Sequence, residues 1–98
     1  MKVEELKHLF SPGKIGSLYV KNRIMMAPLG SRLTTENGAV TDDMIEFYSQ
    51  RARGGAGIIC IEAMGIDYPL AVGNANHVCL HDSWYMPGHA KLAERIHA

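Results

Sequence analysis

The chain of 98 residues lacks an excess of charge of either sign, since ten Lys and Arg residues balance ten Asp and Glu residues. Nucleic-acid-binding proteins usually carry a basic surface and a high isoelectric point, so this balance argues against that class of partner. It also leaves no basic cluster with which to hold an anionic membrane. We therefore expect neither a nucleic acid nor a membrane among the partners.

Long apolar runs and cysteines are also scarce. The longest uninterrupted apolar run, residues 24–29, is far shorter than the ~20 residues that a membrane-spanning helix needs. The first ten residues mix acids with lysines and contain no apolar core, so they do not predict a secretory signal. Two cysteines, Cys60 and Cys79, are too few for a disulfide scaffold in a chain of this size. These features favour a cytoplasmic protein.

The overall composition is that of a globular protein. Hydrophobic residues make up 47% of the chain and charged residues 20%, which is too apolar for intrinsic disorder. No internal repeat or low-complexity tract is present. The length fits one small domain or a portion of a larger one.

Three short segments have the patterns of β-strands. Residues 14–20 contain two short apolar stretches around Gly16-Ser17, which predicts a hairpin. Residues 23–28 and 57–62 are apolar without alternation, as in strands of a parallel sheet that are buried on both faces. Pro28 cannot donate to a strand ladder, so it should mark the carboxyl end of the first of these strands.

Two segments have the patterns of helices. Thr41 can cap a helix over residues 41–53, with two acids in its first turn and two arginines in its last. Residues 83–97 predict a second helix, whose buried stripe would comprise Leu92, Ala93 and Ile96. Between the last strand and this helix, residues 64–82 form a long irregular stretch, and such loops are often functional.

The order hairpin, strand, helix, strand, helix predicts an α/β fold with right-handed crossovers. Two strands do not make a stable α/β sheet alone, because each buried strand needs neighbours. We therefore expect residues 1–98 to be the N-terminal portion of a larger domain.

Small residues follow both predicted parallel strands. Ala27, Pro28, Leu29, Gly30 and Ser31 lie at the carboxyl end of the first strand, and Ala63 comes after the second. Ligands of α/β folds bind at the carboxyl ends of the strands. Small residues, a rigid proline and a glycine would let a flat ligand lie against the main chain there. A strand end followed by a turn, with no ligand, explains the same residues.

Other polar residues have ordinary explanations. Glu62 follows four apolar residues and is either a functional acid or, more commonly, a hydrogen-bond partner of a neighbouring loop. His77, Cys79 and His81 would share one side of an extended chain, but their spacing is unlike that of zinc sites, and we expect no metal.

Several short motifs occur together in a recognisable order. They comprise residues 9–12, 15–16, 21–24, 26–28, 40–41, 48, 51–52, 54, 57–59, 62–63, 80–82 and 91–93. In this order and spacing the chain resembles the opening of old yellow enzyme-type NADH:flavin oxidoreductases. It is more similar to the bacterial dienoyl-CoA/enoate-reductase branch than to the yeast enzymes.

The resemblance implies a (β/α)₈ TIM barrel that holds FMN at the carboxyl ends of its strands, with the hairpin closing the bottom. Such enzymes are ene reductases, in which NAD(P)H reduces the flavin and the flavin N5 passes hydride to a small-molecule alkene activated by a carbonyl or carboxylate group. A barrel of this kind needs about 250 residues, so residues 1–98 would supply the hairpin and two βα units. Catalytic residues, the phosphate-binding loops and any iron–sulfur cluster or FAD would belong beyond Ala98.

By the same resemblance, five residues would bind the cofactor. Ala27, Pro28 and Leu29 match residues that contact the isoalloxazine ring, and Ala63 matches a small residue near the flavin. Gly30 falls where family members often carry Thr or Cys, a side chain that tunes the flavin. The alternative hypothesis is a stand-alone, non-catalytic α/β binding or interaction module.

Overall fold

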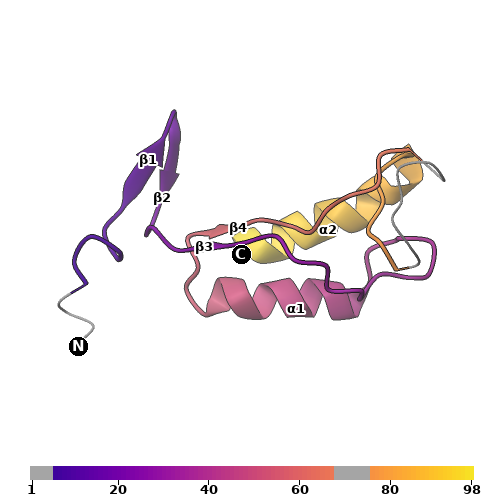
Figure 1. Cartoon of the computed structure of the whole chain (residues 1–98), viewed down its shortest axis with the longest axis horizontal. Coiled ribbons are helices and arrows are strands. Elements are labelled where there is room, and N and C mark those ends of the chain that lie inside the picture. Colours follow the sequence, from indigo (N-terminus) through magenta and orange to yellow (C-terminus); the bar gives the residue numbers. More distant parts are fainter. Residues whose placement is uncertain (1–5, 68–75) are drawn as a thin grey trace.

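A computed structural model describes residues 6–67 and 76–98 of the chain (Figure 1). The elements in order are β1 (Gly13–Ile15), β2 (Leu18–Val20), β3 (Met25–Met26), α1 (Asp42–Arg53), β4 (Ile58–Ile59), the 3₁₀ helix η2 (Ser83–Tyr85) and α2 (Met86–His97). β1 and β2 pair in antiparallel orientation, whereas β3 and β4 pair in parallel. The predicted hairpin and the predicted strand–helix–strand–helix order are therefore confirmed.

The hairpin turns tightly between β1 and β2. Ile15 pairs with Leu18, so Gly16 and Ser17 alone connect the strands. Gly16 has φ +59°, a conformation that matches the twist of a two-residue hairpin turn and that side-chain-bearing residues rarely adopt. The hairpin stands beside the amino-terminal ends of β3 and β4, far from where those strands end (Figure 1).

The parallel strands are shorter than the sequence predicts. Met25 pairs with Ile58 and Met26 with Ile59, and the Cys60 amide donates to the Met26 carbonyl at 3.0 Å. The prediction that both faces are buried is wrong for the described residues, because Met25 is 58% exposed. The physical reason is that helices cover one face only, and no other strand of the described residues pairs with β3 or β4.

The helix α1 has the local signals that the sequence predicts. Thr41 is its N-cap, and the Thr41 hydroxyl oxygen accepts a hydrogen bond from the Met44 amide at 3.1 Å. Asp42 and Asp43 lie in the first turn, where a carboxylate interacts favourably with the helix dipole. Gly54 ends the helix.

The second helix begins later than expected. Asp82 caps η2 by accepting a hydrogen bond from the Trp84 amide at 2.9 Å, and α2 continues from Met86 with Pro87 in its first turn. Pro87 is tolerated there because the first amides of a helix have no intrahelical acceptor. Ala93 is exposed, which corrects the predicted buried stripe, whereas Leu92 is buried.

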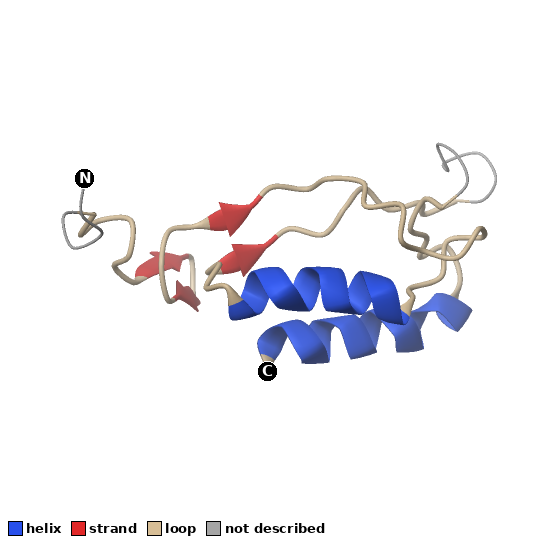
Figure 2. Ribbon diagram, turned by 90° about the horizontal axis from the view of Figure 1, so that it is seen from below, coloured by secondary structure: helices blue, strands red, loops and turns tan. Residues whose placement is uncertain are grey.

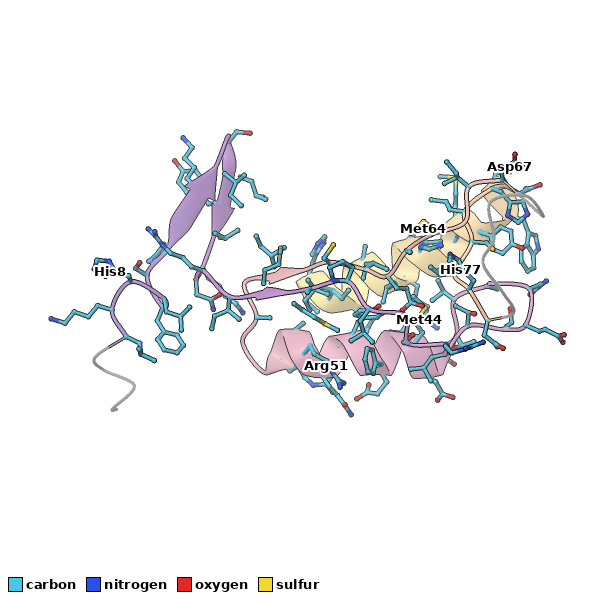
Figure 3. All side chains as sticks on the ribbon, viewed as in Figure 1. His8, Met44, Arg51, Met64, Asp67 and His77 are labelled. Atoms are coloured by element: carbon cyan, nitrogen blue, oxygen red, sulfur yellow. The ribbon has the colours of Figure 1, made fainter. Side chains whose placement is uncertain are left out.

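Both helices lie side by side on the same face of the β3–β4 pair (Figure 2). Each helix starts near the carboxyl ends of the strands and returns toward their amino-terminal ends (Figure 1). The buried core between these layers comprises Met44, Ile45, Tyr48, Val78 and Leu92. Met44 extends from α1 toward the strands, whereas Arg51 extends outward from the same helix (Figure 3).

In the described part of the chain, no helix combines the length and the apolar character that crossing a bilayer requires.

Candidate functional site

The candidate residues lie where β3 and β4 end, at the opposite end of the strands from the hairpin (Figure 1). Residues 27–30 follow β3 directly, and Ala63 follows β4 after three residues. All five residues are exposed to solvent. The structure thus brings the five predicted residues to one end of the sheet, and their role in binding stays a prediction.

A buried carboxylate joins the two segments. Glu62 is only 4% exposed, and its Oε2 atom accepts hydrogen bonds from the Ser31 hydroxyl at 2.8 Å and the Ser31 amide at 3.3 Å. Ser31 directly follows Gly30, and Glu62 directly precedes Ala63. The prediction that Glu62 bonds a neighbouring loop is therefore confirmed, and this bond draws Gly30 and Ala63 toward each other.

Tyr48 supports the same carboxylate from the helix layer. Its hydroxyl donates to Oε2 of Glu62 at 2.6 Å from the buried face of α1. Burial, together with the adjacent Glu62 carboxylate, raises the pKa of Tyr48 well above its ordinary value of 10.0. The phenol therefore stays protonated at neutral pH and remains a donor to Glu62.

The loop after β3 is also fixed to the start of α1. The Ser31 hydroxyl oxygen accepts from the Leu33 amide at 3.3 Å, and the Thr41 hydroxyl donates to the Leu33 carbonyl. Between these two anchors, Arg32 has φ +59°, which is uncommon for a residue with a side chain. The loop and the helix start therefore form one hydrogen-bonded unit.

A second loop packs against the first at this end of the molecule. The Cys79 amide donates to the Gly38 carbonyl at 3.0 Å, and the Asn76 side-chain amide donates to the Thr34 carbonyl at 2.9 Å. Gly38 has φ +93°, and a Cβ atom there would come within 2.5 Å of the Cys79 Sγ atom and the His77 carbonyl oxygen. Met64 and His77 lie at this end too (Figure 3).

Gly30 differs from Gly38 because nothing in the described chain requires a glycine there. Its φ lies outside the left-handed region, and a Cβ atom at this position would meet no atom within 4 Å. The space beside Gly30 is open, next to the exposed Ala27, Pro28 and Leu29. The main chain of residues 27–30 is therefore open to solvent on this side.

The cysteine-containing segment after residue 76 has a packing role. Cys79 is buried, its Sγ atom contacts the His77 carbonyl oxygen at 3.3 Å, and burial raises the pKa of the Cys79 thiol. Among the described residues, no three His, Cys, Asp or Glu side chains are grouped to hold a metal ion.

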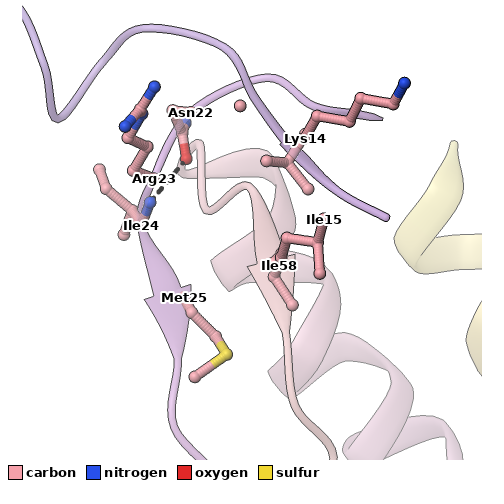
Figure 4. A pocket seen from close by; sticks show the side chains of 9 residues that line it. Lys14, Ile15, Asn22, Arg23, Ile24, Met25 and Ile58 are labelled. Atoms are coloured by element: carbon pink, nitrogen blue, oxygen red, sulfur yellow. Dashed lines mark hydrogen bonds between the residues drawn. The ribbon is translucent and has the colours of Figure 1, made fainter. Parts of the chain in front are cut away.

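A cavity at the other end of the strands contains none of the candidate residues. It lies between the hairpin and the start of β3, with Lys14, Arg23 and Met25 in its lining (Figure 4). Asn22 lies at its edge, where its side-chain oxygen accepts from the Ile24 amide at 3.0 Å and its side-chain amide donates to the Gly55 carbonyl at 2.6 Å. This cavity is the gap between the hairpin and the sheet, and it is remote from the strand ends at which α/β proteins bind ligands.

Parallel strands joined by a helix, with both helices on one face of the strand pair, define an α/β protein. The model of the NADH:flavin oxidoreductase / NADH oxidase family matches residues 8–98, so the chain belongs to this family.

Curated relatives agree with this assignment. The chain is 43% identical over 91 residues to an NADH oxidase of Thermoanaerobacter brockii, covering 93% of this chain and 14% of the relative. It is 47% identical over 91 residues to a metal reductase of Desulforamulus reducens, covering 92% of this chain and 13% of the relative. A cinnamate reductase of Clostridium sporogenes is 42% identical over 57 residues, covering 57% of this chain and 9% of the relative.

The fold is similar to that of solved old yellow enzymes. The crystal structure of old yellow enzyme from Pichia sp. AKU4542 matches 92% of this chain and 23% of that chain, with a TM-score of 0.84 and 29% identity. The chain spans only about a seventh of the length of the NADH oxidase and the metal reductase that it matches. These comparisons favour the flavin oxidoreductase hypothesis and give no support to the stand-alone module.

Two residues of this site were missed from the sequence. The sequence pattern does not identify Ser31 or Tyr48 as a hydrogen-bond partner of Glu62. One signal was available, because a buried tyrosine hydroxyl needs a hydrogen-bond partner and Glu62 is the acid at the end of the neighbouring strand.

Proposed function

We propose that this chain forms the N-terminal part of an FMN-dependent oxidoreductase domain with a (β/α)₈ TIM-barrel fold. In this proposal residues 1–98 supply the hairpin and the first two βα units. The support comes from the parallel β3–β4 pair, the two helices on one face and the family match over residues 8–98. The uncovered face of β3 and β4 would then be covered by further strands of the barrel.

The five candidate residues would form one wall of the FMN site. Ala27, Pro28 and Leu29 would contact the isoalloxazine ring, Gly30 would leave space beside it, and Ala63 would approach it from the end of β4. The observation that carries this proposal is the open space beside Gly30. Neither the backbone conformation nor the packing of the described chain requires a glycine at this position. The phosphate of FMN would be held by loops later in the barrel.

The bound FMN would supply the redox chemistry, which is hydride transfer from NAD(P)H to an alkene activated by a carbonyl or carboxylate group. The residues of this chain would bind the ring, hold its position and exclude water from one side of it. Support for the substrate class comes from the similarity to cinnamate reductase, because cinnamate carries a carboxylate conjugated to its alkene.

The test uses the complete polypeptide that carries this sequence, purified under anaerobic conditions. We expect it to contain FMN. We also expect the amount of NADH or NADPH oxidised to equal the amount of cinnamate-type alkene reduced. Pyridine-nucleotide oxidation with oxygen alone, unaffected by alkenes, would contradict the substrate class. A purified protein that does not bind FMN would contradict the cofactor assignment.

A further inference from the structure

We propose that Glu62 is a positioning residue that fixes the two flavin-facing segments relative to each other by holding Ser31. This inference rests on the proposed function, because the segments concerned are residues 27–30 and Ala63. Glu62 itself need not touch the flavin, since its carboxylate acts through Ser31 and is supported by Tyr48.

The place of Glu62 in the sheet explains why such a residue is needed. Strand pairing stops after the Cys60 amide donates to the Met26 carbonyl. Within the described residues, the next hydrogen bonds between the two diverging segments are those of Ser31 with Glu62. A side chain therefore replaces the strand ladder here, and this leaves the main chain of residues 27–30 unpaired with β4 and open to a ligand.

The hydrogen-bond partners of Glu62 match the needs of a carboxylate acceptor. Three donors converge on Oε2, namely the Ser31 hydroxyl, the Ser31 amide and the Tyr48 hydroxyl. Hydrogen bonds to an ionised acceptor are stronger than those between neutral groups, and buried carboxylates persist where such bonds satisfy them. A glutamine of the same shape keeps one carbonyl oxygen but loses the charge and places an NH₂ group beside these donors.

The experiment compares Glu62→Gln and Ser31→Ala in the complete polypeptide. The matched control is Glu46→Gln, which makes the same substitution at an exposed glutamate of α1 paired with Arg53 at 2.6 Å. Surface ion pairs contribute little to stability, so the control should behave like the parent protein. The two measurements are amide hydrogen exchange of residues 27–33 without FMN, and FMN affinity with the visible circular dichroism of the bound flavin.

In Glu62→Gln we expect exchange in residues 27–33 to be about tenfold faster and FMN affinity to be about tenfold weaker, as the loss of one charge-assisted hydrogen bond would produce. We also expect a changed flavin dichroism, which a general loss of stability would not produce. If Glu62 acts through Ser31, adding Glu62→Gln to Ser31→Ala should have less effect than Glu62→Gln alone.

The outcomes separate this inference from the proposed function. If the parent protein does not hold FMN, the proposed function fails, and the exchange of residues 27–33 alone decides whether Glu62 holds the loop. If the parent holds FMN and Glu62→Gln matches Glu46→Gln in both measurements, the inference is overturned. If Glu62→Gln does not fold, Ser31→Ala decides instead, because Ser31 is only half-buried and its amide remains in place.

Discussion

Two buried polar side chains tie together the ends of the β3–α1–β4 unit. Asn22 bonds the Ile24 amide and the Gly55 carbonyl at the amino-terminal ends of the strands, and Glu62 bonds Ser31 at the carboxyl ends. Their exposed fractions are 9% and 4%. Removing one partner of a buried hydrogen bond costs about 1–3 kcal/mol, so both residues contribute to stability.

Replacing Gly30 or Gly38 by alanine should change the free energy of unfolding in different directions. Gly30→Ala should leave the free energy of unfolding unchanged or raise it by up to about 1 kcal/mol, because the unfolded chain loses entropy and the folded chain has room. Gly38→Ala should lower it by more than about 1 kcal/mol, because of its positive φ and the contact with Cys79. Chemical denaturation of the complete polypeptide measures both, and equal effects would contradict the geometry.

Ala63→Trp should abolish FMN retention, because the indole would fill the space that the ring is proposed to occupy. The flavin content of the purified complete polypeptide measures this. The control is Ala93→Trp, which makes the same substitution at an exposed position of α2. Equal FMN content in Ala63→Trp and in the parent protein would refute the placement of Ala63 at the flavin.

The sequence alone predicts that Ala27, Gly30 and Ala63 lie at one end of the sheet, because each follows an apolar strand, which is a local pattern. It does not predict the hydrogen bonds made there. Ser31 is separated from Glu62 by 31 positions in the sequence, and Tyr48 is separated from it by 14. No local sequence pattern specifies hydrogen bonds over such separations.

At the scale of elements, α1 depends on the cap at Thr41. Thr41→Ala should lower the free energy of unfolding by about 1–2 kcal/mol, because the Met44 amide and the Leu33 carbonyl both lose a partner. Thr41→Ser keeps the hydroxyl and should recover most of this loss. Thermal and chemical denaturation measure the difference, and equal losses in both variants would mean that the methyl group, not the hydroxyl, stabilises the helix start.

The same helix should make the protein sensitive to alkaline pH. The pKa of Tyr48 is raised in the folded state, so above its ordinary value of 10.0 the unfolded state releases a proton that the folded state retains. Stability from this group is therefore complete below about pH 10 and falls as pH rises further. Tyr48→Phe should be less stable at neutral pH but should lose less stability between neutral pH and pH 11 than the parent, as denaturation at each pH would show.

An equal decline in both proteins would contradict the Tyr48 assignment. The matched control is Tyr19→Phe, which makes the same substitution at an exposed tyrosine of β2.

Helix bounds were predicted more closely than strand bounds. Thr41 and Gly54 set the ends of α1 through local chemistry, so the sequence alone located them. Strand length depends on partners elsewhere in the chain, and β3 and β4 each pair over two residues only. Ala93 was assigned to the wrong side of α2 because the core of the described chain reaches that helix mainly at Leu92 and Ile96.

At the scale of the whole molecule, the chain is elongated. Its radius of gyration is 15.5 Å and its extents are 48 × 27 × 23 Å, whereas a compact domain of 100 residues has a radius of gyration of about 13 Å. The hairpin extends beyond the sheet, and large apolar side chains remain exposed on it and on β3, among them Ile15, Leu18 and Met25.

The 98-residue polypeptide on its own should therefore neither reduce alkenes nor bind FMN tightly. It would supply one wall of the site, and its unpaired strand edges and exposed apolar side chains should favour self-association. Fluorescence titration with FMN and analytical ultracentrifugation test this. Saturable micromolar binding by a cooperatively folding monomer would contradict it and favour the stand-alone module.

The close packing of Gly38 against Cys79 has a consequence for how this end of the protein can vary. The loop that contains Gly38 and the segment 76–79 share backbone hydrogen bonds and leave no room for a side chain between them. Exchanging one of these loops alone between members of the family would therefore disrupt the packing and the hydrogen bonds between the two loops. Both loops would have to be transplanted together, and sequence changes in one loop should be accompanied in evolution by changes in the other.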